Sequence, residues 1–160
     1  MYRKIIGVIG SSQPDSKTRQ IAYKVGKLIA ENGYPLVTGG LTGVMESVCE
    51  GAKSANGLTI GILPDEHPDN ANKYIDIAIP TGFGYGRNVI LVRTAAVLIA
   101  ISGGYGTLSE IGFALNLRKT VISLNSWDIP KAGKVDDGLF IYATTPEEAV
   151  DKAIETINRC

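Results

Sequence analysis

The fold of this chain is decided by the stretch Val97-Leu98-Ile99-Ala100-Ile101-Ser102-Gly103-Gly104-Tyr105-Gly106-Thr107. Its first five residues are all apolar and do not show the alternation of a strand that has one face in water. Continuous apolar runs of this length are typical of strands buried on both faces, as in a parallel sheet covered by helices. The run ends in a turn of small residues, and a helical pattern follows. The stretch therefore predicts a strand, a glycine-rich turn and a helix within a parallel sheet.

Six more short runs of apolar and β-branched residues occur along the chain, and longer segments with helical spacing stand between them. Strands that alternate with helices form right-handed crossovers. The sequence therefore predicts an α/β fold, a Rossmann-like doubly wound parallel sheet in a three-layer α/β/α sandwich. We expect strands in the order 3-2-1-4-5, with further strands at the edges. The predicted strands are residues 4–9, 35–37, 59–63, 75–79, 97–101, 120–124 and 139–142.

The last predicted helix has the clearest local signals. Thr145 can cap its N-terminus, Pro146 suits its first turn, and Glu147 and Glu148 meet the positive end of its dipole. The other predicted helices cover residues 21–29 and 44–55 and follow Gly86 and Gly106.

Length and composition bound what the chain can be. Its 160 residues fit one domain, spanning residues 1–160. Its 16 basic and 16 acidic residues balance, so no overall field attracts nucleic acid or an anionic membrane. The longest apolar stretch, residues 89–101, is interrupted by Arg93 and is too short to span a bilayer. We expect a cytoplasmic protein with neither nucleic acid nor membrane among its partners.

The cysteines and the single histidine indicate no metal site. Cys49 and Cys160 are far apart, and neither belongs to a Cys-x-x-Cys or Cys/His cluster. Cys49 lies within an apolar helical pattern, which predicts a small buried hydrophobic residue. His67 lies in a polar loop, where we expect it to be solvated.

Small residues follow four of the predicted strands directly, and each of these turns opens a helix. In a parallel sheet all such turns lie along the same carboxyl edge. Their sequences are Gly10-Ser11-Ser12, Thr38-Gly39-Gly40-Leu41-Thr42-Gly43, Thr81-Gly82-Phe83-Gly84-Tyr85-Gly86-Arg87 and Ser102-Gly103-Gly104-Tyr105-Gly106-Thr107.

This arrangement suits a phosphate-bearing ligand. Glycine lets a ligand approach the backbone closely, and the first turn of a helix offers unpaired N–H groups and a positive dipole end. Arg87 adds a bidentate cation at the mouth of one turn. The predicted phosphate-binding residues are Gly10, Ser11, Ser12, Gly39, Gly40, Thr42, Gly43, Gly103, Gly104, Gly106 and Thr107.

Two common nucleotide motifs are absent. The first turn, Gly7-Val8-Ile9-Gly10-Ser11-Ser12, is not G-x-G-x-x-G, and the second strand ends without the acid that binds a ribose. NAD is therefore not the expected ligand. No glycine-rich turn runs into Gly-Lys-Ser/Thr, so the sequence does not contain a P-loop either.

The segment Gly103-Gly104-Tyr105-Gly106-Thr107-Leu108-Ser109-Glu110 resembles the GGxGTxxE motif of the LONELY GUY (LOG) family, long mislabelled as lysine decarboxylases. Gly39-Gly40-Leu41-Thr42-Gly43-Val44-Met45 is similar to that family's GGxxGLM segment. Arg87 stands before Glu110 at the spacing of the family's paired arginine and glutamate. The resemblance extends from the first strand to about Leu124.

The resemblance implies a phosphoribohydrolase, which cleaves the N-glycosidic bond of nucleoside 5′-monophosphates. It implies that Gly104, Gly106 and Thr107 hold the 5′-phosphate and that Arg87 and Glu110 are the catalytic pair. A carboxylate at that place can stabilise positive charge on the ribose or orient the attacking water. An arginine can orient the ribose or phosphate and hold the carboxylate ionised.

Departures from the LOG pattern keep a second reading open. LOG sequences usually carry PGG where this chain has Ser102-Gly103-Gly104, an aspartate at Ala96 and a glycine at Glu46. These residues are more similar to the molybdenum-cofactor carrier-like branch of the same superfamily, whose members bind a phosphorylated pterin. That branch implies a bound cargo and no catalytic cofactor. A nucleotide-sensing module is a third, weaker alternative.

Further expectations concern assembly and loops. Resemblance to the LOG family and resemblance to the carrier-like branch both imply a homo-oligomer, either a dimer or a tetramer. The apolar helix around residues 89–96 is one candidate interface. Glu46 is either a first-turn acid or a ligand contact. The polar loops at residues 65–73 and 126–138 are candidates for a lid.

Overall fold

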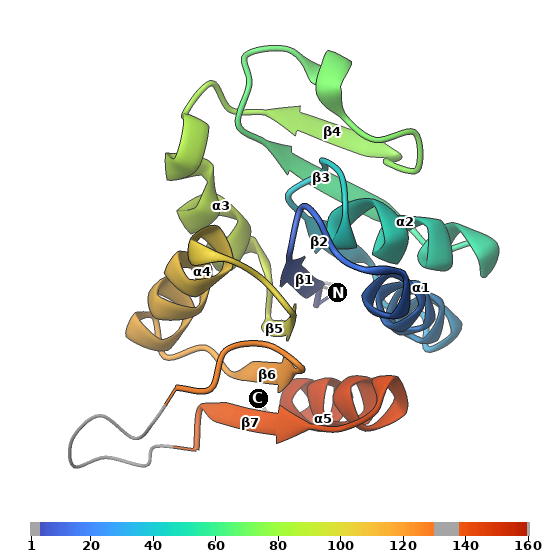
Figure 1. Cartoon of the computed structure of the whole chain (residues 1–160), viewed down its shortest axis with the longest axis vertical. Coiled ribbons are helices and arrows are strands. Elements are labelled where there is room, and N and C mark those ends of the chain that lie inside the picture. Colours follow the sequence, from blue (N-terminus) through green and yellow to red (C-terminus); the bar gives the residue numbers. More distant parts are fainter. Residues whose placement is uncertain (1–3, 130–137, 160) are drawn as a thin grey trace.

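The computed structural model describes residues 4–129 and 138–159 and contains a seven-stranded parallel sheet (Figure 1). The α/β class and the Rossmann-like doubly wound sheet are confirmed. The strands are β1 (Ile6–Gly10), β2 (Leu36–Thr38), β3 (Thr59–Leu63), β4 (Ile77–Pro80), β5 (Val97–Ile101), β6 (Val121–Leu124) and β7 (Phe140–Ala143).

The predicted strand order is wrong in one respect. The sheet runs β4-β3-β2-β1-β5-β6-β7, so the fourth strand lies outside β3 at the edge and not beside β1. The segment between β3 and β4 contains only the short helix η1 (Pro68–Asn70), and the chain therefore adds β4 to the same side. The order in which strands are added changes to the other side of β1 one element later, at the crossover through α3 (Arg87–Thr94) to β5.

Helices cover both faces of the sheet (Figure 1). One face carries α1 (Ser16–Glu31), α2 (Val44–Ser54) and α5 (Pro146–Arg159), and the other carries α3 and α4 (Tyr105–Asn116). Two buried clusters fill the spaces between sheet and helices, one around Ile6, Val8 and Ile99, the other around Leu98 and Ile111. The central strands thus face a core on both sides, as their composition predicts, whereas Ile77 and Ile79 of the edge strand β4 are exposed.

The register of the two central strands determines where their turns meet. Strands β1 and β5 pair along five positions, from Ile6 opposite Val97 to Gly10 opposite Ile101. The two strands therefore end at the same level. Their glycine-rich turns stand side by side at the carboxyl edge of the sheet, where the sequence places a ligand.

Helices α1 and α2 pack with their backbones in direct contact. A Cβ on Gly51 would overlap the carbonyl oxygen of Tyr23, and a Cβ on Gly26 would overlap that of Val48. Each glycine thus faces the main chain of the other helix. This contact fixes α2, whose first turn follows the glycine segment after β2.

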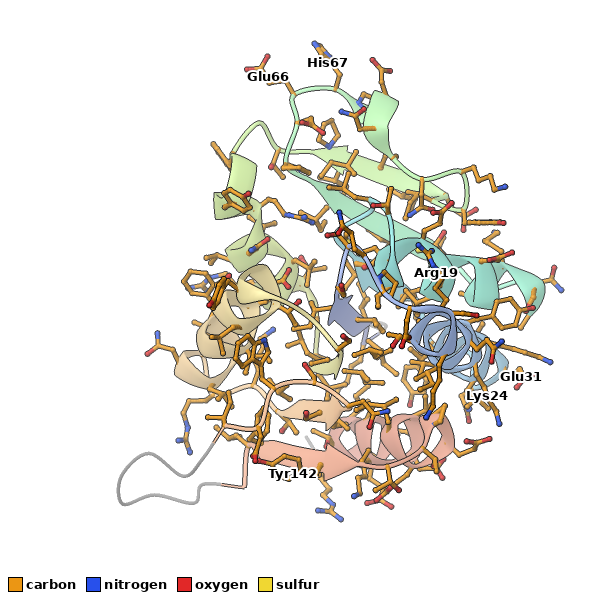
Figure 2. All side chains as sticks on the ribbon, viewed as in Figure 1. Arg19, Lys24, Glu31, Glu66, His67 and Tyr142 are labelled. Carbon is orange, nitrogen blue, oxygen red and sulfur yellow. The ribbon has the colours of Figure 1, made fainter. Side chains whose placement is uncertain are left out.

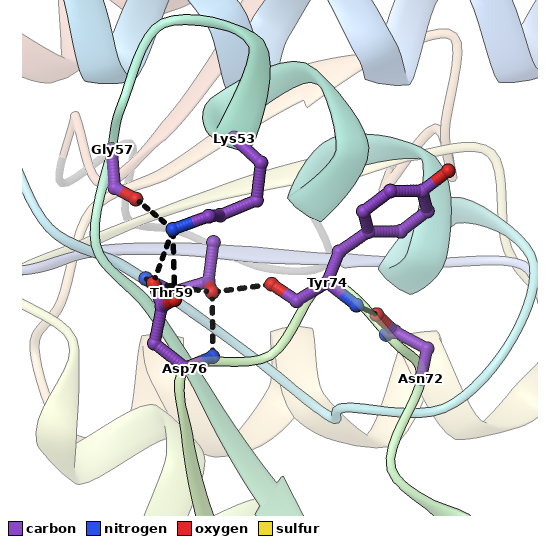
Figure 3. Close-up of polar contacts among 6 residues, drawn as sticks. All are labelled: Lys53, Gly57, Thr59, Asn72, Tyr74 and Asp76. Carbon is purple, nitrogen blue, oxygen red and sulfur yellow. Dashed lines mark hydrogen bonds and ion pairs between the residues drawn. The ribbon is translucent and has the colours of Figure 1, made fainter.

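The edge strand β4 is tied to the sheet by a polar network (Figure 3). Lys53 Nζ lies 2.7 Å from Asp76 Oδ1 and also donates to the carbonyl of Gly57. Asp76 Oδ2 accepts from the backbone N–H of Thr59, and the Thr59 hydroxyl donates to the carbonyl of Tyr74. The network joins α2, β3 and the segment that leads into β4.

The predicted start of the last helix is confirmed, whereas α1 and α4 begin earlier than predicted, α1 at Ser16. Thr145 Oγ1 accepts from the N–H of Glu148 at 3.1 Å and so caps α5. Helix α4 begins at Tyr105 and not after Gly106, because Gly104 already occupies its N-cap position. Gly106 therefore belongs to the first helical turn.

Several single residues lie where the sequence predicts. Cys49 is fully buried, and burial raises the pKa of its thiol to about 12. Figure 2 shows Glu66 and His67 at the tip of the β3–β4 loop, pointing away from the sheet. Cys160 and most of the loop at 126–138 lie outside the described residues. Within the described part of the chain, no helix is long and apolar enough to cross a membrane.

Candidate functional site

A cavity of about 640 Å³ opens at the carboxyl edge of the sheet. It lies over the ends of β1, β2 and β5 and is closed on one side by the first turns of α3 and α4. Of the predicted site residues, those that line it are Gly10, Ser11, Ser12, Gly39, Arg87, Gly103, Gly104, Gly106, Thr107 and Glu110.

The N-terminus of α4 forms the wall where an anion fits best. Gly104 is the N-cap and has no side chain, so the first N–H groups of the helix have no side-chain cap. Gly103 has φ +120°, and a Cβ there would stand 2.5 Å from Thr107 Cβ. Only glycine allows this turn, which presents the open helix end to the cavity.

Ser102, which precedes this turn, is in the left-handed region with φ +54°. The segment after β6 stabilises the turn from outside: the Ser126 hydroxyl donates to the carbonyl of Ser102, and Trp127 Nε1 donates to that of Gly104 at 3.1 Å. Two tertiary hydrogen bonds therefore accompany a backbone conformation that costs a non-glycine residue about 1–2 kcal/mol.

Ser102→Gly and Ser102→Pro are expected to have opposite effects. Glycine accepts a positive φ, so it should raise the free energy of unfolding by up to about 1 kcal/mol. Proline fixes φ near −65° and should lower that free energy by about 3 kcal/mol or deform the turn. Urea denaturation of both variants tests this, and a proline variant as stable as wild type would contradict a left-handed Ser102.

Arg87 is buried and does not stand at the mouth of its turn. Its guanidinium Nη1 donates to the carbonyl of Ile62 on β3 at 2.7 Å, and the side chain is 9% exposed. It runs beneath Gly39, where a Cβ would lie 2.9 Å from Arg87 Cζ. Burial lowers the pKa of Arg87, while the charges of Glu110 and Asp65 oppose that shift. The guanidinium remains a cation in the floor of the cavity.

Glu110 reaches the same cavity from the second turn of α4 and is 7% exposed. Burial raises the pKa of its carboxyl group to about 7, and the neighbouring charge of Arg87 only partly opposes this. Arg87 thus favours the ionised form of Glu110, as expected, but its effect is smaller than that of burial. Near neutral pH the group is present in both protonation states, which suits either proton transfer or hydrogen bonding to a ligand.

The second glycine turn contributes less than the sequence suggests. Gly39 lines the cavity, whereas Gly40, Thr42 and Gly43 do not. Gly43 has φ +75°, and a Cβ there would stand 2.6 Å from the carbonyl carbon of Ser12, so this glycine serves close packing of two turns. Glu46 lies in a separate, smaller hollow lined by residues of α1 and α2.

Asn72 anchors this second turn, and sequence reasoning missed it. Its backbone N–H donates to the carbonyl of Gly40, and its Nδ2 donates to that of Leu41, both at 2.8 Å. Asn72 Oδ1 in turn accepts from the N–H of Tyr74 (Figure 3). The loop at 65–73 thus supports the cavity from outside through its last residues. No local sequence pattern signals such a contact across 31 residues.

Two tyrosines in the cavity lining were also missed. Tyr85 and Tyr105 lie within glycine-rich turns that the sequence places at the edge of the sheet where a ligand is expected. Both tyrosine side chains also border the cavity. The available signal was an aromatic residue flanked by glycines in both turns.

Comparisons with known proteins agree on one superfamily. The family model described as LDcluster4, SLOG cluster4 family, matches residues 3–150. A molybdenum cofactor binding protein from Rippkaea orientalis superimposes with a TM-score of 0.91 at 41% identity, over 98% of this chain and 99% of that one. The molybdenum cofactor carrier protein of Chlamydomonas reinhardtii gives a TM-score of 0.87 at 35% identity, over 98% and 99%.

Similarity to a phosphoribohydrolase is more distant. A cytokinin riboside 5′-monophosphate phosphoribohydrolase of Mycobacterium marinum is 29% identical over 117 residues. The match covers 68% of this chain and 63% of that protein. The carrier proteins thus match end to end, whereas the hydrolase matches over part of its length.

Proposed function

The chain belongs to the SLOG cluster4 family, and from that premise we propose that it carries the molybdenum cofactor, a phosphorylated pterin, in the cavity at the carboxyl edge of its sheet. The cofactor is cargo in this proposal and takes part in no reaction on the protein. Similarity over the full length to a molybdenum cofactor binding protein and to a molybdenum cofactor carrier protein supports the proposal.

The observation that carries the proposal is the left-handed backbone at Ser102. The LOG pattern has proline at this position, and proline holds φ near −65°, about 120° from the value of +54° seen here. The turn that leads into α4 therefore has a path that the LOG sequence is unable to follow. This favours the carrier-like branch, because the Ser-Gly-Gly sequence of this turn is more similar to that branch.

The residues of the cavity fit such a cargo. Uncapped N–H groups of α4 suit the phosphate, and Arg87 places a positive charge in the floor. The volume of about 640 Å³ lies in the range of pockets for ligands of this size. Glu110, with a pKa of about 7, can offer a proton or accept one from a polar ring edge.

Retention of the cofactor tests this function, with a matched pair of variants at Gly104. A Cβ at Gly104 meets nothing within 4 Å and the residue has φ −102°, so Asp and Asn both fit and both cap helices well. Gly104→Asp adds a negative charge where the phosphate is expected. It should weaken binding at least about tenfold more than Gly104→Asn, because anions repel at that place.

The measurement is anaerobic incubation with released molybdenum cofactor, followed by desalting and assay of molybdenum and pterin in the protein fraction. We expect wild-type protein to retain both and Gly104→Asp to retain neither. Serum albumin serves as the non-binding control. If wild-type protein loses the cofactor as fast as serum albumin does, the carrier proposal is wrong.

A second function is favoured by one specific feature, the buried Arg87 and Glu110 in one cavity. A carboxyl group with a raised pKa beside a fixed cation is typical of catalytic sites. We therefore propose nucleoside 5′-monophosphate hydrolysis as the alternative. Base release from a panel of monophosphates, compared with Arg87→Ala and Glu110→Ala, tests it. Release that is equal in all three proteins would remove this alternative.

A further inference from the structure

Two large aromatic side chains at the rim of the cavity are almost fully exposed. Tyr85 is 89% exposed and Tyr105 is 84% exposed, although both line a cavity whose floor is buried. They come from the segments that open α3 and α4, which lie beside each other on one face of the sheet (Figure 1). Phe83 is 68% exposed but does not line the cavity. Aromatic rings therefore face the cavity opening from two separate elements.

Tyr105 is held in place from behind. Its ring stacks on Trp127, with centroids 6.1 Å apart and planes inclined by 29°. Trp127 is itself fixed, because its Nε1 donates to the carbonyl of Gly104 at 3.1 Å. A stacked pair anchored to the backbone loses little conformational entropy when a third ring joins it. The phenol ring is thus arranged before any ligand binds.

The position of Tyr105 relates it to the anion-binding end of α4. It is the first residue of that helix, directly after the uncapped Gly104. A ligand whose phosphate binds the helix N-terminus has the rest of its body within reach of this ring. Planar heterocycles stack well on tyrosine, since every such ring presents a π-face.

We propose that Tyr105, braced by Trp127, is the subsite that stacks on the planar heterocycle of the ligand, with Tyr85 as the second aromatic wall. Only the identity of that heterocycle as a pterin rests on the function proposed above. The chemical class that the subsite accepts is a planar, fused heterocycle joined to a phosphate. Phosphorylated sugars that carry no planar heterocycle use the helix end alone.

Trp127 provides a direct readout, because it is the one tryptophan of the chain. GMP serves as the probe that carries a heterocycle, since guanine shares the amino-oxo pyrimidine edge of a pterin. Ribose 5-phosphate serves as the probe that lacks a heterocyclic base. Titration calorimetry gives both affinities, and intrinsic fluorescence reports on the environment of Trp127 in the stacked pair with Tyr105. We expect GMP to change Trp127 emission and ribose 5-phosphate to leave it unchanged.

Variants separate stacking from structure. Tyr105→Leu should weaken GMP binding about tenfold, while Tyr105→Phe should stay within about twofold of wild type. Both variants should bind ribose 5-phosphate as wild type does. Phe83→Leu, an exposed aromatic outside the cavity lining, is the control and should change neither affinity.

Failure of the subsite is distinguishable from failure of the carrier function. If Tyr105→Leu binds GMP as wild type does, or loses both probes equally, the subsite is overturned, whatever the cofactor assay gives. If wild-type protein binds GMP through Tyr105 but loses the molybdenum cofactor on desalting, the subsite stands and the carrier function fails.

Discussion

Gly51→Ala is expected to destabilise the folded state strongly. The added methyl group would overlap the carbonyl oxygen of Tyr23, and it would stand 2.7 Å from the carbonyl carbon and 3.0 Å from the backbone N of Lys27. Backbone atoms of a helix do not move aside as a flexible side chain does. Helices α1 and α2 would have to separate, at an expected cost of at least about 3 kcal/mol. Urea denaturation measures the loss.

Gly112→Ala is the matched control, since it makes the same change inside a helix. A Cβ at Gly112 in α4 meets nothing within 4 Å, so alanine should gain about 1 kcal/mol from helix propensity alone. Gly26→Ala, on the other side of the contact, should behave like Gly51→Ala. A Gly51→Ala protein as stable as Gly112→Ala would mean that the two helices are not in backbone contact.

Glu110→Gln is expected to stabilise the protein above pH 7 and to flatten its pH dependence. Burial raises the pKa of Glu110 from 4.5 to about 7, so between these values the folded state binds more protons than the unfolded state. The free energy of unfolding therefore falls as pH rises through this window. The shift corresponds to about 3 kcal/mol, fully present below pH 4.5 and lost by about pH 7.

Denaturation at pH 5 and pH 8 measures this effect. Glutamine resembles the protonated carboxyl group in shape, so the variant should match wild type at pH 5 and exceed it by about 1–3 kcal/mol at pH 8. Glu50→Gln, at an exposed position on α2, controls for the loss of one negative charge. Equal stability of wild type and Glu110→Gln at pH 8 would show that Glu110 ionises without cost.

The superfamily resemblance seen in the glycine segments is confirmed by the family match over residues 3–150. The residues that carried it are ones whose backbone role is fixed locally. Gly103 is required by its own φ, and the GGxGT turn follows an apolar strand wherever that strand lies in the sheet. A short pattern was enough to find these features.

The strands, the start of α5 and the glycine-rich turns could be predicted from the sequence alone, because each depends on residues close together in the chain. Continuous apolar runs specify strands buried on both faces, and Thr145 with Pro146 specifies a helix start. These signals act over a few residues, and no distant contact is needed to read them.

Only the tertiary structure decided the neighbours of β4, the turns that reach the cavity and the electrostatics within it. The strand order depends on how a crossover passes the sheet, which apolar patterns leave open. Arg87 is buried because Gly39 and the carbonyl of Ile62 receive it, and Glu110 owes its raised pKa to the dehydrated wall around it. Solvent exclusion and long-range hydrogen bonds are properties of the assembled fold, since they require parts of the chain that are far apart in sequence to meet.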